Sequence, residues 1–176
     1  MRDCEQNYAP TKFYALEETD QYRRYVVLCS EITVMKKLLL RMLDFFNADL
    51  VVMIKTVVAY DEISKEYDWD YYTGDSNRDR VLDSINMFED YIFHDPSHQL
   101  LVRDKRSHDY FTFDEHGTLF IYTDRNVEYI LEQHSIPFEN NHNLKWECGQ
   151  IKYVMGSLCE NFEKLKNYLG LSIRKT

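Results

Sequence analysis

Short apolar runs alternate with apolar stripes at helical spacing along this chain, and the two patterns predict a mixture of strands and helices. Residues 25–29 form a run rich in β-branched side chains, which is typical of a buried strand. Residues 12–16 are expected to pair with that strand as a hairpin. The clearest strand signal is the nearly continuous apolar run 50–59, which predicts a central strand buried on both faces.

Helical periodicity predicts four helices, over 30–46, 79–93, 124–134 and 151–169. Ser30 is expected to cap the first helix, and Ser76 with Asp79 resembles a capping box for the second. Gly117 suits a tight turn between two further strands. Three such strands are expected, over 99–102, 109–113 and 118–123.

Strands in two groups, with helices between and after them, predict an α+β fold. No linker-like stretch divides the sequence, so residues 1–176 are expected to form a single domain. Its mainly antiparallel sheet is expected to be covered by about four helices.

Charge and hydropathy indicate which partners and which location this protein has. The chain has 21 Lys and Arg against 30 Asp and Glu, which gives a formal net charge of −9. A surface of that sign repels nucleic acids and anionic membranes, so neither is an expected partner. The N-terminal residues lack the apolar core of a secretion signal, and the longest apolar runs are too short to span a membrane. A cytoplasmic location is therefore expected.

Catalytic and cofactor-binding signatures are missing from the sequence. Its four cysteines form no C-x-x-C pair, and its five glycines form no phosphate-binding pattern. Cys29 and Cys159 lie within apolar patterns, where a buried free thiol is the expected state. We therefore expect a protein that is not an enzyme and that needs no cofactor.

Negative charge is concentrated in the middle of the chain. Residues 1–60 hold eight basic and eight acidic side chains, whereas 61–150 hold eight basic and twenty acidic ones. The densest acidic stretch, 60–75, also contains five large aromatic residues. Because it follows the best strand and precedes a helix, it is expected to be a connection on the surface.

This stretch is the candidate binding site. Tyr and Trp rings anchor protein interfaces, and carboxylates attract a basic partner over long range. We expect a non-enzymatic module that binds a protein rich in Lys and Arg. The alternative is that the rings pack back onto the core and the acids form a solvated rim. The expected site residues are Tyr67, Asp68, Trp69, Asp70, Tyr71, Tyr72 and Asp75.

Two other functions compete with this interpretation. Carboxylates are the ligands that divalent cations prefer, so a metal-dependent hydrolase built from the Asp61–Asp75 carboxylates is one alternative. An EF-hand loop starting at Asp68 is excluded, because Tyr72 and Thr73 occupy its fifth and sixth positions. The other alternative is a subunit of a homo-oligomer, in which the aromatic rings meet a second copy. The acids available to the hydrolase are Asp61, Glu62, Glu66, Asp68 and Asp70.

Histidines offer little support for metal or acid–base chemistry. His94 and His98 have the spacing of a zinc-binding helix, but Pro96 between them breaks a helix. His108 and His116 lie at the two ends of an expected hairpin, and no G-x-S-x-G motif supplies a nucleophile for them. Surface histidines are the simpler interpretation. No metal site is expected.

The stretch Asp68-Trp69-Asp70-Tyr71-Tyr72, followed by Gly74-Asp75, resembles the Tyr-Tyr and acid cluster by which colicin DNase immunity proteins bind their toxins. Those proteins are short and all-helical, so the resemblance implies a class of function and no shared fold. Other immunity families are α+β, with a hairpin followed by a helix, somewhat like residues 110–134 here. The resemblance implies an inhibitor that neutralises a toxin by occupying its basic site.

Overall fold

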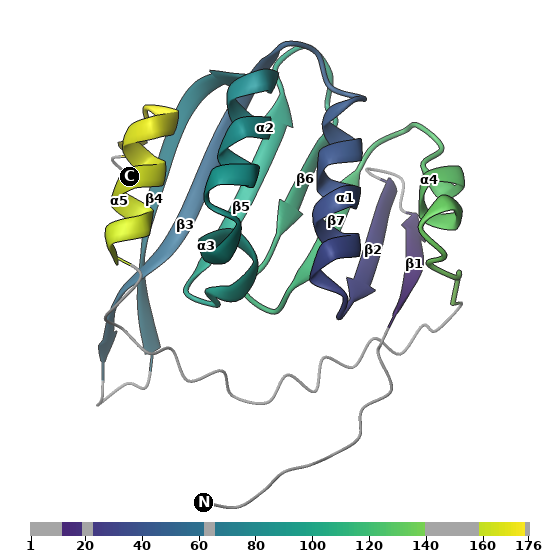
Figure 1. The fold of residues 1–176 in the computed structure, drawn as a ribbon, viewed down its shortest axis with the longest axis horizontal. Coiled ribbons are helices and arrows are strands. Elements are labelled where there is room, and N and C mark those ends of the chain that lie inside the picture. The colour runs from purple at the N-terminus through teal and green to yellow at the C-terminus, as the bar shows by residue number, and fades with distance from the viewer. Residues whose placement is uncertain (1–11, 19–22, 62–65, 140–158, 175–176) are drawn as a thin grey trace, which may run out of the picture.

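The computed structural model describes residues 12–18, 23–61, 66–139 and 159–174, and within them eight strands form one sheet (Figure 1). The order of the strands across the sheet is β1-β2-β7-β6-β5-β3-β4-β8, and all neighbours are antiparallel. The predicted α+β fold is confirmed. The strands are β1 Lys12–Glu18, β2 Arg23–Cys29, β3 Asp49–Asp61, β4 Glu66–Asn77, β5 His98–Asp104, β6 Tyr110–Phe113, β7 Thr118–Tyr122 and β8 Ser172–Ile173.

Five helices lie in the described residues, rather than the predicted four or so. In Figure 1, α1, α2, α3 and α5 cover the near face of the sheet, and α4 lies beside the β1 edge. Their apolar stripes and the strand residues facing them form one buried cluster. The helices are α1 Ile32–Leu43, α2 Arg78–Met87, α3 Glu89–His94, α4 Glu128–Gln133 and α5 Cys159–Leu169.

Two helix starts differ from the sequence prediction. Glu31, not Ser30, occupies the N-cap of α1, and its side chain makes no capping hydrogen bond. The second helix begins from Asn77, whose side chain accepts a hydrogen bond from the Arg80 amide at 2.8 Å. No Ser76–Asp79 capping box forms, because Asn77 already fills the capping position. The predicted helix 79–93 is divided at Phe88 into α2 and α3.

The largest correction concerns residues 60–75. The sequence predicts a surface connection there, but the structure has the end of β3 and most of β4, which pair along their length as a hairpin. Consequently β3 has a neighbour on each side, as predicted, but the described helices cover only one of its faces. Leu50, Val52 and Ile54 are fully buried towards the helices, whereas Val51 and Met53 on the other face are only half-buried.

The opposite side of the sheet, which we call the helix-free face, carries none of the described helices. Its side chains follow from the register, because alternate residues of a strand point to opposite faces. One row across it reads Glu17, Arg24, Tyr122, Tyr110, Arg103, Val51 and Asp75, from β1 to β4. The next row includes Phe120, Thr112, Leu101, Met53 and Thr73.

Short segments lie along both edges of the sheet. At the β1 edge, the Tyr14 amide donates to the Pro137 carbonyl and the Glu139 amide donates to the Tyr14 carbonyl, both at 2.9 Å. At the other edge, β8 pairs with β4 at Tyr72 and Thr73 only. Gly74 lets the end of α5 approach, since a Cβ atom there would lie 2.9 Å from the Gly170 carbonyl oxygen.

The remaining strands and the Gly117 turn are confirmed with small shifts of their ends, and Gly117 has the positive φ of 75° expected of it. Cys29 is a buried free thiol, as predicted. The first part of the predicted helix 151–169 and the side chain of Cys159, expected to be a buried free thiol, lie outside the described part of the chain.

His98 is buried in the sheet beneath α3, where its ring stacks on Tyr91 at 4.2 Å between centroids. Neither of its ring nitrogens has a hydrogen-bond partner in the described part of the chain. Burial lowers the pKa of His98 from 6.5 to about 4, and the nearby Asp95 only partly opposes that shift. Between pH 6.5 and about 4, the His98 imidazole is therefore neutral in the folded protein and protonated in the unfolded chain.

We predict that His98 makes the protein less stable in mild acid. Between pH 6.5 and about 4 the unfolded chain binds a proton that the folded chain excludes, so the free energy of unfolding falls as pH falls. The loss across this window is about 3 kcal/mol. His98→Phe keeps an aromatic ring against Tyr91 and is expected to remove this dependence in urea unfolding. His94→Ala, at an exposed site, is the control, and an unchanged pH slope in His98→Phe would contradict the prediction.

Candidate functional site

The candidate site residues lie on a strand, and this divides them between two faces. Val57 pairs with Trp69 and Lys55 with Tyr71, so these rings point to the helix-free face. By alternation Tyr67 shares that face, whereas Asp68, Asp70 and Tyr72 point to the other. The sequence predicts one surface with rings and carboxylates mixed, but the structure separates them.

Trp69 already contacts a cation of its own chain. The Lys55 ammonium lies 4.1 Å from the centroid of the Trp69 ring, which is the geometry of a cation–π interaction. Tyr67, Trp69 and Tyr71 are all half-buried, so none of them is a core residue. The three rings form a continuous aromatic row along the strand, at every second position.

Tyr72 lies on the face of the sheet that the helices cover, where it contacts α5. Its ring meets Phe162 of α5 edge-on at 5.0 Å, and the Lys166 ammonium lies 5.1 Å from its centroid. The Tyr72 hydroxyl donates to the Asp70 carboxylate at 3.2 Å. Burial, and then the hydrogen bond to Asp70, raise the pKa of Tyr72. Tyr72 therefore fastens α5 to β4, which is the alternative role that the sequence left open for these rings.

The carboxylates of the candidate site have different surroundings. Asp68 is exposed, and Asp70 accepts the hydroxyl of Tyr72. Asp75 lies at the far end of β4, where it forms an ion pair with Lys105 at 2.6 Å. Asp75 is thus separated from the other site residues and has a cation of the same chain beside it.

The described residues do not assemble a metal centre. No group of three or more His, Cys, Asp or Glu side chains in them is arranged to hold an ion. His98 is buried in β5 and His94 is exposed at the end of α3, so the two do not form a helical pair. The side chains of Asp61, Glu62 and Glu66 lie outside the described set.

A cavity of about 290 Å³ is lined by both Cys29 and His116, which the sequence predicts to be a buried thiol and a surface histidine. It lies between the start of α1, Phe93 and the β6–β7 turn. Burial raises the pKa of the Cys29 thiol, and its sulfur contacts the Glu31 carbonyl at 3.7 Å. A raised pKa disfavours the thiolate, so the arrangement does not produce an activated nucleophile.

A larger cavity, of about 630 Å³, lies on the helix-free face. Half-buried apolar side chains from β3 and β5 line its middle, and polar side chains surround them. No sequence motif marks this place, because its residues come from six separate parts of the chain. Only the strand order brings them together.

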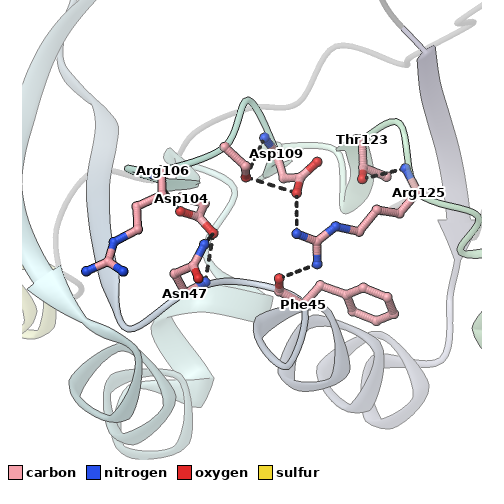
Figure 2. Close-up of polar contacts among 8 residues, drawn as sticks. Phe45, Asn47, Asp104, Arg106, Asp109, Thr123 and Arg125 are labelled. Atoms are coloured by element: carbon pink, nitrogen blue, oxygen red, sulfur yellow. Dashed lines mark hydrogen bonds and ion pairs between the residues drawn. The ribbon is translucent and has the colours of Figure 1, made fainter.

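Two buried carboxylates organise the loops at one end of that cavity (Figure 2). Asp104 is fully buried and accepts hydrogen bonds at 2.7 Å from the amide and side chain of Asn47 and from the amide of Arg106. Asp109 accepts from Ser107 and pairs with Arg125 at 3.3 Å. These contacts fix the β5–β6 loop, whose residues His108 and Asp109 line the cavity.

Electrostatics show that Asp104 is held as a carboxylate. Burial by itself would raise the pKa of Asp104, but the hydrogen bonds from Asn47 and Arg106 outweigh it and lower the pKa. Donors of this kind stabilise the charge of a carboxylate in a fully buried position.

Among the described residues, no helix has the length and apolar character needed to cross a bilayer. No family model, curated protein or solved structure matches this chain.

We predict that Asp104→Ala lowers the free energy of unfolding at neutral pH by about 2–3 kcal/mol, because it removes charge-assisted hydrogen bonds. Since the folded state depresses the pKa of Asp104, its contribution is complete above the ordinary value of 3.8 and is lost as pH falls towards the folded value. The difference between variant and wild type, measured by urea unfolding, should therefore shrink in acid. Asp44→Ala, which breaks only an exposed pair with Arg41, should cost no more than about 0.5 kcal/mol.

Proposed function

We propose that this protein is a non-enzymatic binding module that receives a basic protein partner at the end of the β3–β4 hairpin. The observation that carries the proposal is that this hairpin continues past the rest of the sheet (Figure 1). β5 pairs with β3 only between Leu50 and Thr56, and beyond that point β3 and β4 pair with each other. We call the continuing part, residues 57–61 and 66–69, the hairpin arm; Asp70 and Tyr71 adjoin it, opposite Thr56 and Lys55.

Sequence and local geometry explain why the arm is accessible. Val58 is the extra residue of a β-bulge between Val57 and Ala59, and its side chain is 40% exposed. Bulges increase twist and bend a strand, which turns the hairpin away from the sheet. Among the described side chains of the arm, Val58 and Asp68 are exposed and Tyr67 and Trp69 are half-buried, so a partner can reach the arm from either face.

The aromatic row provides the anchors. Half-buried Trp and Tyr rings gain much contact area on binding and lose little conformational freedom, which is why they are common at interface hot spots. The face of Trp69 already holds the ammonium group of Lys55, which illustrates how a ring of this row receives a cation. Lys or Arg side chains of a partner would meet Tyr71 in the same way.

The carboxylates supply attraction from the second face. Asp68 is exposed there, beside Asp70. A partner that clasps the arm from both sides meets rings on one side and carboxylates on the other. The net charge of −9 adds long-range attraction and raises the association rate of a positively charged partner.

An immunity protein that blocks the basic site of a toxin, such as a nuclease, is the specific form of this proposal. It is supported by the small size and acidity of the chain and by the local likeness of residues 68–75 to the toxin-binding cluster of colicin DNase immunity proteins. The occupied site would be rich in Lys and Arg because it normally holds a polyanion. Cytoplasmic residence belongs to the same proposal.

We predict that Trp69→Ala combined with Tyr71→Ala weakens partner binding by about 2–4 kcal/mol without lowering the unfolding midpoint. The partner is first captured from lysate of the native host, and its affinity for each variant is then measured by calorimetry. Tyr129→Ala, at a 46% exposed ring on α4, is the matched control and should bind as wild type. Tyr72→Ala should instead lower stability, since Tyr72 packs on Phe162.

Wild-type affinity in the double variant would contradict the assignment of the aromatic row as the anchor. The alternative of a homo-oligomer is tested by light scattering, which measures the molar mass of the protein without a partner. A dimer that dissociates in the same double variant would assign the rings to self-association in place of a partner.

A further inference from the structure

We infer that the 630 Å³ cavity on the helix-free face binds a small organic anion that carries a planar ring. This inference does not depend on the proposed partner, because the cavity is lined by residues of β2–β7 and their loops and by Arg174 beside β8, away from the end of the hairpin arm. Its volume falls within the range of about 300–1,000 Å³ that is usual for small-molecule sites.

The floor of the cavity is apolar. Val51, Met53 and Leu101 come from neighbouring strands β3 and β5 and face the cavity side by side. These side chains are half-buried, so a ligand that covers them removes apolar surface from water. Sites for small molecules have this character, with a few polar groups placed around an apolar surface.

The guanidinium groups of Arg103 and Arg174 also line the cavity. Arg103 lies next to Val51 in the register, and Arg174 follows β8, where its amide donates to the Tyr71 carbonyl at 2.7 Å. No acidic side chain in the described residues forms an ion pair with either of them. Guanidinium groups recognise carboxylates and phosphates through paired hydrogen bonds. These two cations are therefore available to an anion.

Acidic side chains around the cavity do not cancel this charge. Asp109 is buried and already pairs with Arg125 and Ser107. Asp124 is exposed at the rim. The third arginine of the lining, Arg23, is held by Glu18 at 2.9 Å. The anion is thus expected beside Arg103 and Arg174, on the β3–β8 side of the cavity.

An aromatic stack forms the wall on the other side. The rings of Tyr110 and Tyr122 are nearly parallel, 12° apart, with centroids separated by 4.2 Å. Because Tyr122, Tyr110 and Arg103 follow one another in one row across the sheet, the far face of the Tyr110 ring is turned towards Arg103. A planar ring of a ligand can continue this stack, with its anionic group directed to the guanidinium groups.

Hydrogen bonds hold the stack in place. The Tyr122 hydroxyl accepts a hydrogen bond from Arg24 at 2.8 Å, and Arg24 is itself held by Glu17. Burial, together with the neighbouring Tyr122 hydroxyl, raises the pKa of Tyr110 to about 12. A neutral Tyr110 hydroxyl does not repel an anion.

The experiment titrates the full isotope-labelled chain and follows amide shifts by NMR. Adenosine monophosphate, a ring with an anionic group, is expected to bind with a dissociation constant below about 1 mM and to shift the amides of Thr73, Leu101 and Tyr110. Adenosine lacks the anionic group and inorganic phosphate lacks the ring, so each is expected to bind at least about tenfold more weakly. Benzoate is titrated in parallel, and binding at the same amides would assign the site to ring carboxylates.

Arg103→Ala and Arg174→Ala should each weaken binding of the ring anion about tenfold or more. Arg106→Ala is the control, because Arg106 belongs to the adjoining loop, pairs with Asp49 and does not line the cavity. The inference is overturned if neither ring anion binds at about 10 mM, if the shifts fall outside the cavity, or if adenosine or phosphate alone binds as well as the whole molecule.

Discussion

One-sided packing of helices on a single antiparallel sheet governs the rest of this structure. Each strand gives alternate side chains to the helices, and burial of those side chains stabilises the fold. The same alternation leaves the intervening residues on the helix-free face, where aromatic rings and arginines collect. Both the hairpin arm and the larger cavity therefore follow from one register, and a shift of one residue would exchange their faces.

The alternation of side chains along β4 separates the rings of the acidic, aromatic stretch 60–75 from its carboxylates. Along the chain its rings and carboxylates are mixed, so they resemble one composite patch. In the sheet they separate, with Trp69 and Tyr71 on the face of Lys55 and with Asp68 and Asp70 behind them. A partner must reach around the arm to use both groups. Such a requirement favours an enclosing cleft over a flat surface.

Sequence periodicity predicted most elements of the fold, because apolar runs and helical stripes reflect burial on one face. The prediction was wrong for β4, because the acidic residues between its aromatic rings have the composition of a surface loop. Yet Tyr67, Trp69 and Tyr71 recur at every second position, which is itself a strand signal.

The sequence predicts that Trp69, Tyr71, Tyr72 and Asp75 all bind a partner. In the structure Trp69 and Tyr71 are half-buried on the helix-free face, whereas Tyr72 packs on Phe162 and Asp75 pairs with Lys105. These two contacts are made by residues far away in the sequence, so no local pattern could predict them. The larger cavity was beyond sequence reasoning, because Arg103, Tyr110 and Arg174 become neighbours only through long-range strand pairing.

The two edges of the sheet are each protected by a very short segment. Phe138 lies against β1 and Ser172–Ile173 against β4, held by only a few main-chain hydrogen bonds. An uncovered edge strand is a template for pairing with other chains. Loss of either segment would leave the buried cluster largely in place and expose a row of amides and carbonyls. These two short segments therefore keep the sheet from adding a further strand from another molecule.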